Sequence, residues 1–138
     1  MSDLRIVTPE ELDHLATGAW ILGTGGGGDP YHGLLGIRAL YAEGARVSLI
    51  DPEALDDDAR VAVIAQMGAP VVNLERITDA AMTTKAVRMM EDYVGHRFDA
   101  LMPSEIGGGN ALQPFLAAAK TGYPVVDADT MGRAYPSV

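Results

Sequence analysis

From residue 47 onward, short apolar segments alternate with segments that carry helical start and stop signals. The expected strands are Val47 to Ile50, Val61 to Ala65, Phe98 to Met102 and a segment that begins at Pro124. The expected helices in this half run from about Asp79 to Val94 and from Asn110 to about Lys120. Strands that alternate with helices usually form a parallel sheet with helices packed on it. We therefore expect an α/β fold, with a mostly parallel sheet flanked by helices and Gly-rich loops at strand and helix ends.

The first half of the chain predicts two helices. Thr8 is suited to cap the first helix, with Pro9 at its first position and Glu11 completing a capping box, and Gly23 should end it. Asp29 should cap the second helix, which runs to about Glu43 and stops at Gly44. The residues of this second helix expected to face the core are Leu34, Ile37 and Tyr41.

The helix expected over residues 79–94 carries an apolar stripe at helical spacing, made of Met82, Ala86, Met89, Met90 and Tyr93. Because methionine fills irregular gaps well, we predict that this stripe packs into the core. In the next helix, Asn110 should act as the cap, and Pro114 should kink the helix or delay its start.

Composition narrows the classes of function. The 138 residues, 48% of them hydrophobic, suit one domain with its own core. A net charge of −9 argues against binding to nucleic acid or to an anionic membrane surface. The absence of cysteine excludes disulfides and thiolate metal sites. No membrane-length apolar run and no secretion signal are visible, so the expected location is the cytoplasm.

Three carboxylates follow two of the expected strands: Glu105 after the strand ending at Met102, and Asp127 and Asp129 after Val126. If these strands pair in parallel, their carboxyl ends share one sheet edge, where ligands of open α/β sheets bind. The carboxylates could then hold a divalent cation through oxygen, or act as proton donor and acceptor. Alternatively, Asp127 and Asp129 only cap the turn after the strand.

The first glycine run formally contains the G-x-G-x-x-G pattern at Gly23, Gly25 and Gly28, and Asp51 follows a downstream strand. A dinucleotide site needs a strand before this loop, and only residues 20–22 could form one. The negative charge of Asp29 would also oppose a phosphate. The remaining interpretation is a loop of backbone N–H groups that holds a carboxylate, a carbonyl or an oxyanion, with His32 beside it for proton transfer.

Three segments together resemble the S-methyl thiohydantoin desulfurase family, whose members are often found beside hydantoinases. The segments are Gly23–Tyr31, Met102–Asn110 and Pro124–Pro136. The resemblance covers about Thr8 to Pro136, and it implies replacement of an S-methyl group by oxygen with release of methanethiol. Family members are considerably longer. The resemblance therefore implies that residues 1–138 are a single α/β domain, similar to the N-terminal domain of a two-domain protein or to a subunit with a separate partner.

The leading hypothesis is part of a hydrolase that acts on a small cyclic thioimidate or amide, such as a hydantoin derivative. The candidate catalytic residues are Glu105, Asp127, His32 and Asp129. The candidate substrate-binding residues are Gly25, Gly26, Gly27, Gly28, Asp29, Gly107, Gly108, Gly109 and Asn110. A nucleotide-binding module that uses residues 23–28 and a non-catalytic subunit that needs a partner chain stay open as alternatives, as do homo-oligomer formation and a divalent cation.

Overall fold

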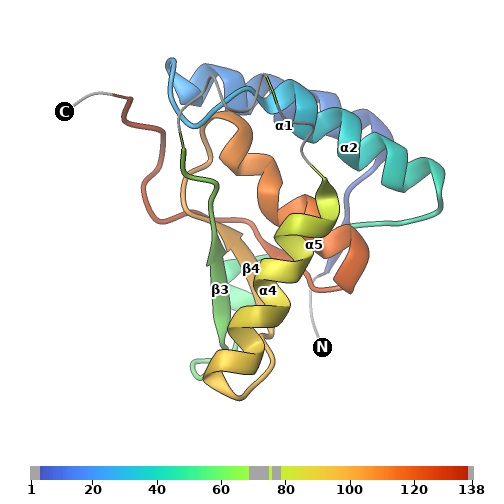
Figure 1. Cartoon of the computed structure of the whole chain (residues 1–138), viewed down its shortest axis with the longest axis vertical. Helices are drawn as coiled ribbons and strands as arrows, with labels where there is room; N and C mark the ends of the chain where they lie inside the picture. Colours follow the sequence, from blue (N-terminus) through green and yellow to red (C-terminus); the bar gives the residue numbers. More distant parts are fainter. Residues whose placement is uncertain (1–3, 69–74, 76–78, 137–138) are drawn as a thin grey trace.

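A computed structural model describes residues 4–68, 75 and 79–136, and it shows an α/β fold (Figure 1). Within these described residues the sheet has five strands in the order β1-β2-β5-β4-β3. The strands are β1 (Arg5–Ile6), β2 (Ser48–Ile50), β3 (Val61–Ile64), β4 (Ala100–Pro103) and β5 (Val125–Val126). The pairs β2–β5, β5–β4 and β4–β3 are parallel, which confirms the predicted arrangement. The antiparallel edge strand β1 was not predicted.

Local capping chemistry explains where the first two helices begin and end. Helix α1 (Pro9–Gly23) starts at the predicted capping box of Thr8 and Glu11. Helix α2 (Pro30–Ala42) starts where the carboxylate of Asp29 accepts the N–H of Tyr31 at 2.7 Å. Both helices therefore begin at the residues that the sequence predicted.

In the second half, helix α4 (Ala80–Val94) starts at Asp79, while helix α5 (Gln113–Thr121) starts later than predicted. Asn110 does not cap α5, because it lies inside the short 3₁₀ helix η2 (Gly108–Leu112) that precedes it. Pro114 lies in the first turn of α5, where a missing N–H costs little. A second 3₁₀ helix, η1 (Pro52–Ala54), follows β2.

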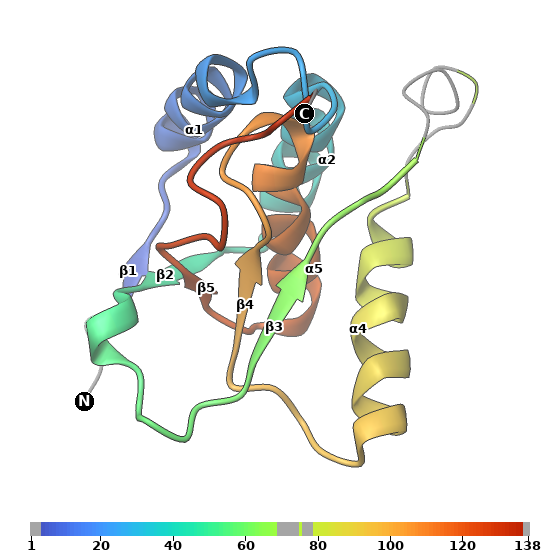
Figure 2. The ribbon, with the colours of Figure 1, turned by 90° about the vertical axis from the view of Figure 1, so that its left-hand side faces the viewer.

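Helix α5 is the centre of the packing. Residues 113–118 of α5 are all buried, and this helix contacts the sheet, α2 and α4 (Figure 2). Leu34, Ile37 and Tyr41 of α2 lie in the same core, as the sequence predicted. The opposite face of the sheet carries a smaller cluster formed by Ile50, Ala100 and Val126. Among the described residues, no helix is both long and apolar enough to cross a membrane.

The apolar stripe of α4 does not pack into the core, so this prediction was wrong. Met82 is 43% exposed and Tyr93 87% exposed, and Ala86, Met89 and Met90 are exposed as well. Helix α4 instead buries the side that carries Val87 and Glu91. The prediction failed because it assumed that the apolar side of an amphipathic helix must be the side that packs.

Candidate functional site

The two glycine-rich segments contact each other directly through their backbones. The N–H of Gly109 donates to the carbonyl of Gly28 at 2.8 Å, and the N–H of Asn110 donates to that of Gly27 at 3.1 Å. A Cβ atom on Gly27 would lie 2.3 Å from the carbonyl oxygen of Gly107, closer than side chains approach backbone. Several positions in these segments therefore need glycine because the two chain segments touch there, and not because a ligand binds.

The three segments that carry the family resemblance, which we call the hallmark segments, come together in the structure. The third of them, residues 124–136, closes onto the two glycine-rich ones. The N–H of Ala134 donates to the carbonyl of Leu22 at 3.2 Å, and the N–H of Thr130 donates to that of Ser104 at 3.2 Å. In Figure 2 the C-terminal segment runs up to the connection between α1 and α2. Three segments that are far apart in the sequence thus form one hydrogen-bonded unit, which we call the loop junction.

Glu105 lies inside the loop junction. It is 9% exposed, and its Oε1 accepts the side-chain N–H of Asn110 at 2.7 Å. Asn110 is fixed in turn, because its Oδ1 accepts the backbone N–H of Gln66 at 2.7 Å. The same Glu105 Oε1 is 3.0 Å from the position that a Cβ on Gly27 would occupy. The structure therefore brings together Glu105, Asn110 and the first glycine run, which the sequence placed in one site.

The hydrogen bonds around Asn110 continue into residues that the sequence analysis did not select. Gln113 of α5 donates to the side chain of Gln66 at 3.5 Å and accepts the hydroxyl of Thr83 at 3.0 Å. Gln113 is only 7% exposed, which is unusual for an amide. A glutamine in the otherwise apolar sequence 111–118 was the signal that could have revealed this network.

Asp129 and Asp127 differ in their surroundings. The carboxylate of Asp129 accepts the backbone N–H of Ile106 at 2.7 Å and that of Gly132, so it fixes two parts of the loop junction. Asp127 is exposed beyond β5. No three acidic or histidine side chains come together as a metal site in the part of the chain that the structure describes. The structure thus does not assemble Glu105, Asp127 and Asp129 into the divalent-cation site considered from the sequence.

His32 and Asp29 lie at the surface at the start of α2. The ring of His32 contacts the ring of Tyr31 edge-on, with 5.8 Å between centroids. Besides capping α2, Asp29 Oδ1 accepts the indole N–H of Trp20 at 3.3 Å. Asp29 therefore has a structural role, whereas the His32 ring is open to solvent.

The backbone N–H groups of the glycine-rich segments are not equally available. Those of Gly26 and Gly109 already donate to backbone carbonyls. Those of Gly25, Gly27 and Gly28 donate to no backbone carbonyl among the residues described. Gly25 and Gly28 also have open space where a side chain would point, so a ligand could approach the first run.

Helix α1 continues through Gly23, so residues 20–22 are helical and no strand precedes the first glycine run. The G-x-G-x-x-G pattern therefore lacks the strand that a dinucleotide-binding turn requires. The nucleotide-binding alternative loses its structural basis, although the pattern is present in the sequence.

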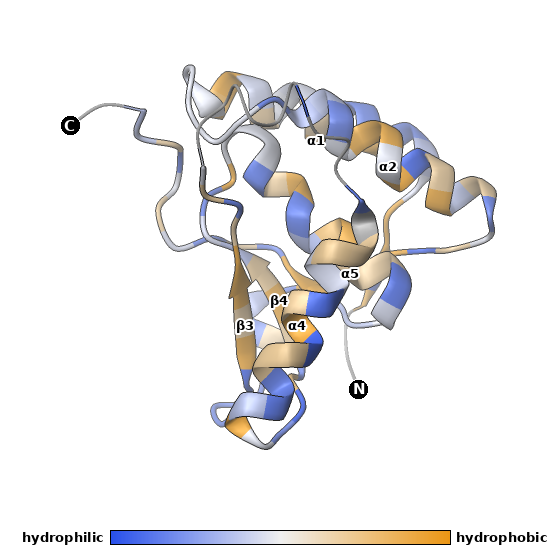
Figure 3. Ribbon diagram, viewed as in Figure 1, coloured by the Kyte–Doolittle hydropathy of each residue, from blue (hydrophilic) through white to orange (hydrophobic). Residues whose placement is uncertain are grey.

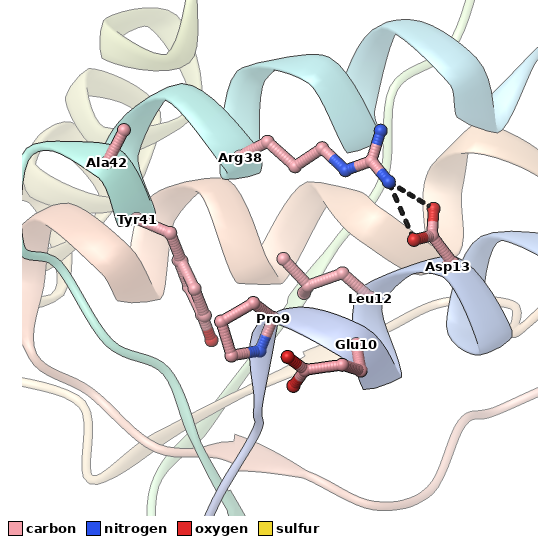
Figure 4. A pocket seen from close by; sticks show the side chains of 7 residues that line it. All are labelled: Pro9, Glu10, Leu12, Asp13, Arg38, Tyr41 and Ala42. Carbon is pink, nitrogen blue, oxygen red and sulfur yellow. Dashed lines mark hydrogen bonds and ion pairs between the residues drawn. The ribbon is translucent and has the colours of Figure 1, made fainter.

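A groove of about 440 Å³ lies at the other end of the α1–α2 pair (Figure 4). Its lining residues are Pro9, Glu10, Leu12, Asp13, Arg38, Tyr41 and Ala42. Arg38 bridges both carboxylate oxygens of Asp13 at 2.6 Å across it. The groove contains none of the candidate site residues, and an ion pair this exposed adds little stability.

With this geometry established, comparison with known proteins identifies the family. The sequence model of the S-Me-THD-like N-terminal domain matches residues 10–138, which include all three hallmark segments. The chain belongs to this family. The loop junction is thus the place where the hallmark segments of an S-Me-THD-like domain meet.

A solved structure has a similar fold. The S-Me-THD-like domain aligns with the crystal structure of a protein from Chromobacterium violaceum with a TM-score of 0.72 and 29% identity. The alignment covers 96% of this chain but 37% of that chain, so the domain spans little more than a third of its structural relative. No curated protein matches the S-Me-THD-like domain significantly.

Proposed function

We propose that this domain is part of a hydrolase that acts on a small cyclic thioimidate or amide, with an S-methyl thiohydantoin as the substrate class. Water would add to the carbon that bears sulfur. The C–S bond would then break, leaving a carbonyl on the ring and releasing methanethiol. Of the two protons of water, one would end on the ring nitrogen of the thioimidate and the other, relayed by protein side chains, on the departing sulfur. The observation that carries this proposal is the position of Glu105, buried in the loop junction beside the exposed backbone of the first glycine run.

Glu105 is proposed as the general base. Its Oε1 is held by Asn110, which orients the carboxylate so that its other oxygen can accept a proton from water. The N–H groups of Gly27 and Gly28 are proposed to stabilise the negative charge that develops during addition. Gly109, Gly26 and Asp129 are instead proposed to hold the loops in place, since their polar groups are already engaged.

Proton delivery to the departing sulfur requires a second group. Asp127 and His32 are the candidates, because both side chains are exposed near the edges of the loop junction. A protonated imidazole can give a proton to a thiolate as it leaves. The proposal therefore assigns to Glu105 the proton taken from water and to His32 or Asp127 the proton given to sulfur.

The test measures the release of methanethiol from an S-methyl thiohydantoin by the full-length protein. The described sequence contains no cysteine, so these residues add no background to a thiol-reactive dye. We expect Glu105→Gln to lower kcat by at least about a hundredfold, because general base catalysis contributes about 10² to 10⁴.

The matched control is Glu53→Gln, which changes an exposed carboxylate in η1 and should leave turnover unchanged. Equal turnover by the wild type and Glu105→Gln would remove Glu105 from the mechanism. No thiol release by the folded wild-type protein would contradict the proposed activity and favour a non-catalytic subunit.

A further inference from the structure

Helix α4 presents a hydrophobic surface to solvent along most of its length. We call it the α4 stripe, and its members are Met82, Ala86, Met89, Met90 and Tyr93. Their large side chains are 43%, 61%, 50% and 87% exposed for Met82, Met89, Met90 and Tyr93 respectively. Figure 3 shows hydrophobic residues alternating with hydrophilic ones along α4. Contiguous exposed apolar residues of this kind usually mark a site of contact with another protein.

The α4 stripe lies on the side of the helix that faces away from the domain. With about 3.6 residues per turn, positions 82, 86, 89 and 93 share one side, and Val87 and Glu91 lie on the opposite side. Val87 is 4% exposed and packs in the core, and Glu91 is also buried. The orientation of α4 is therefore fixed, and the α4 stripe cannot turn inward.

Two opposite charges lie on the same flank of the α4 stripe. Lys85 and Asp92 are both exposed, and the helical period places them side by side along the helix axis. They are separated by about 10.5 Å of helix rise. The point midway between them, next to Met89, is also the middle of the α4 stripe.

We propose that the α4 stripe is the surface through which two copies of this chain associate, with their α4 helices antiparallel. A two-fold axis near Met89 would place Met89 and Ala86 of both copies in the centre of the contact. It would also bring Lys85 of each copy opposite Asp92 of the second copy. The same surface patch would serve both copies, as in other two-fold interfaces.

Charge complementarity favours a second copy in this orientation. In a parallel two-fold arrangement the flanks that carry Lys85 and Asp92 would lie on opposite sides of the contact, so these charges would not meet. Only the antiparallel arrangement places Lys85 of each copy opposite Asp92 of the other copy. Because each chain carries a net charge of −9, association needs such local complementarity and apolar contact to overcome overall repulsion.

Sedimentation equilibrium of the chain at roughly 100 µM tests the proposal, and the expected result is a dimer that dissociates on dilution. Met89→Glu should weaken association by about a hundredfold, because it buries two unpaired charges at the contact. Leu35→Glu is the matched control, since Leu35 of α2 is likewise an exposed apolar residue on a helix but lies outside the α4 stripe. Circular dichroism checks that each variant keeps its fold.

Exchanging the charges at positions 85 and 92 distinguishes the antiparallel dimer from any other contact made by the α4 stripe. Lys85→Asp and Asp92→Lys should each weaken the dimer by about tenfold, whereas the double variant should restore association to near the wild-type level. A monomer at all concentrations would overturn the proposal. It would also be overturned by a dimer that survives Met89→Glu, or by a double variant no tighter than either single variant.

Discussion

At the scale of single residues, glycine has two distinct uses in this domain. Gly27 and Gly107 allow the backbones of two segments to touch, while Gly25 and Gly28 leave their surroundings open. Close approach at the first pair stabilises the fold, and open space at the second pair gives access to a ligand. The sequence could not separate these uses, because Gly25, Gly27 and Gly28 lie within the same short run.

Gly27→Ala should destabilise the fold by about 2–4 kcal/mol, because a Cβ there collides with the Gly107 carbonyl and Gly27 has a positive φ of 74°. Urea unfolding followed by circular dichroism measures the change. Gly18→Ala is the control, since Gly18 lies in the middle of α1 with open space around it. That control should stabilise the fold by about 0.5–1 kcal/mol. Equal midpoints for the two variants would refute the contact between the glycine runs.

The position of Glu105 in the fold could be predicted from the sequence, because it follows the apolar segment that forms β4. Its burial and its hydrogen bond with Asn110 are findings of the structure, and its role in a site stays a prediction. The bond of Asp129 to Gly132 fits the alternative in which Asp129 caps the turn after the strand. The bonds of Asp129 to Ile106 and of Gly109 to Gly28 could not be predicted, because they join residues more than twenty and more than eighty positions apart respectively. Neither propensity nor spacing carries that information.

At the scale of elements, one buried carboxylate joins the end of α4 to its neighbours. Glu91 accepts hydrogen bonds from Tyr123, Arg88, Arg97 and the backbone N–H of Phe98. Burial acts to raise the pKa of Glu91, and these hydrogen bonds outweigh it, so the pKa falls to about 2. The helix is thus anchored by a group that must stay ionised.

The stability that Glu91 provides should depend on pH in a defined direction. Its pKa is below the ordinary value of 4.5, so the native state favours the ionised form. The contribution is therefore complete above about pH 5 and is lost as the pH falls towards 2. Urea midpoints between pH 6 and pH 2.5 should fall less steeply for Glu91→Gln than for the wild type.

Glu53→Gln is the control for this titration, because Glu53 is an exposed carboxylate of η1 that lies outside the contacts of α4, and this variant should preserve the wild-type slope. If Glu91→Gln and the wild type lose stability in parallel, the carboxylate does not anchor the helix by its charge.

The bounds of the elements could be predicted from local chemistry, whereas the direction each helix faces could not. Thr8, Asp29 and Asp79 begin their helices as the capping rules require. The prediction that the α4 stripe packs into the core was wrong, because periodicity identifies an apolar side of a helix without showing what covers that side. In α4 the polar Glu91 is buried instead, since its charge has partners on several elements.

At the scale of the whole molecule, the sheet order interleaves distant parts of the sequence. β5 lies between β2 and β4, so the last strand of the chain is central. Alternation of strands and helices predicted the parallel sheet but not the order of its strands. The antiparallel strand β1 is only two residues long, which is too short to be recognised in the sequence. The same order brings residues 124–136 to the glycine-rich segments.

The loop junction has a consequence for the order in which the chain folds. The contact between Leu22 and Ala134 spans more than a hundred positions, so its loop closure comes late and costs entropy. Helices α1 and α4 can form from local contacts, but the loop junction cannot form until the chain as far as Ala134 has left the ribosome. In pulsed hydrogen exchange during refolding, the amides of Ile106 and Gly109 should gain protection after those of α1. If they gain protection together, the domain instead folds in one concerted step.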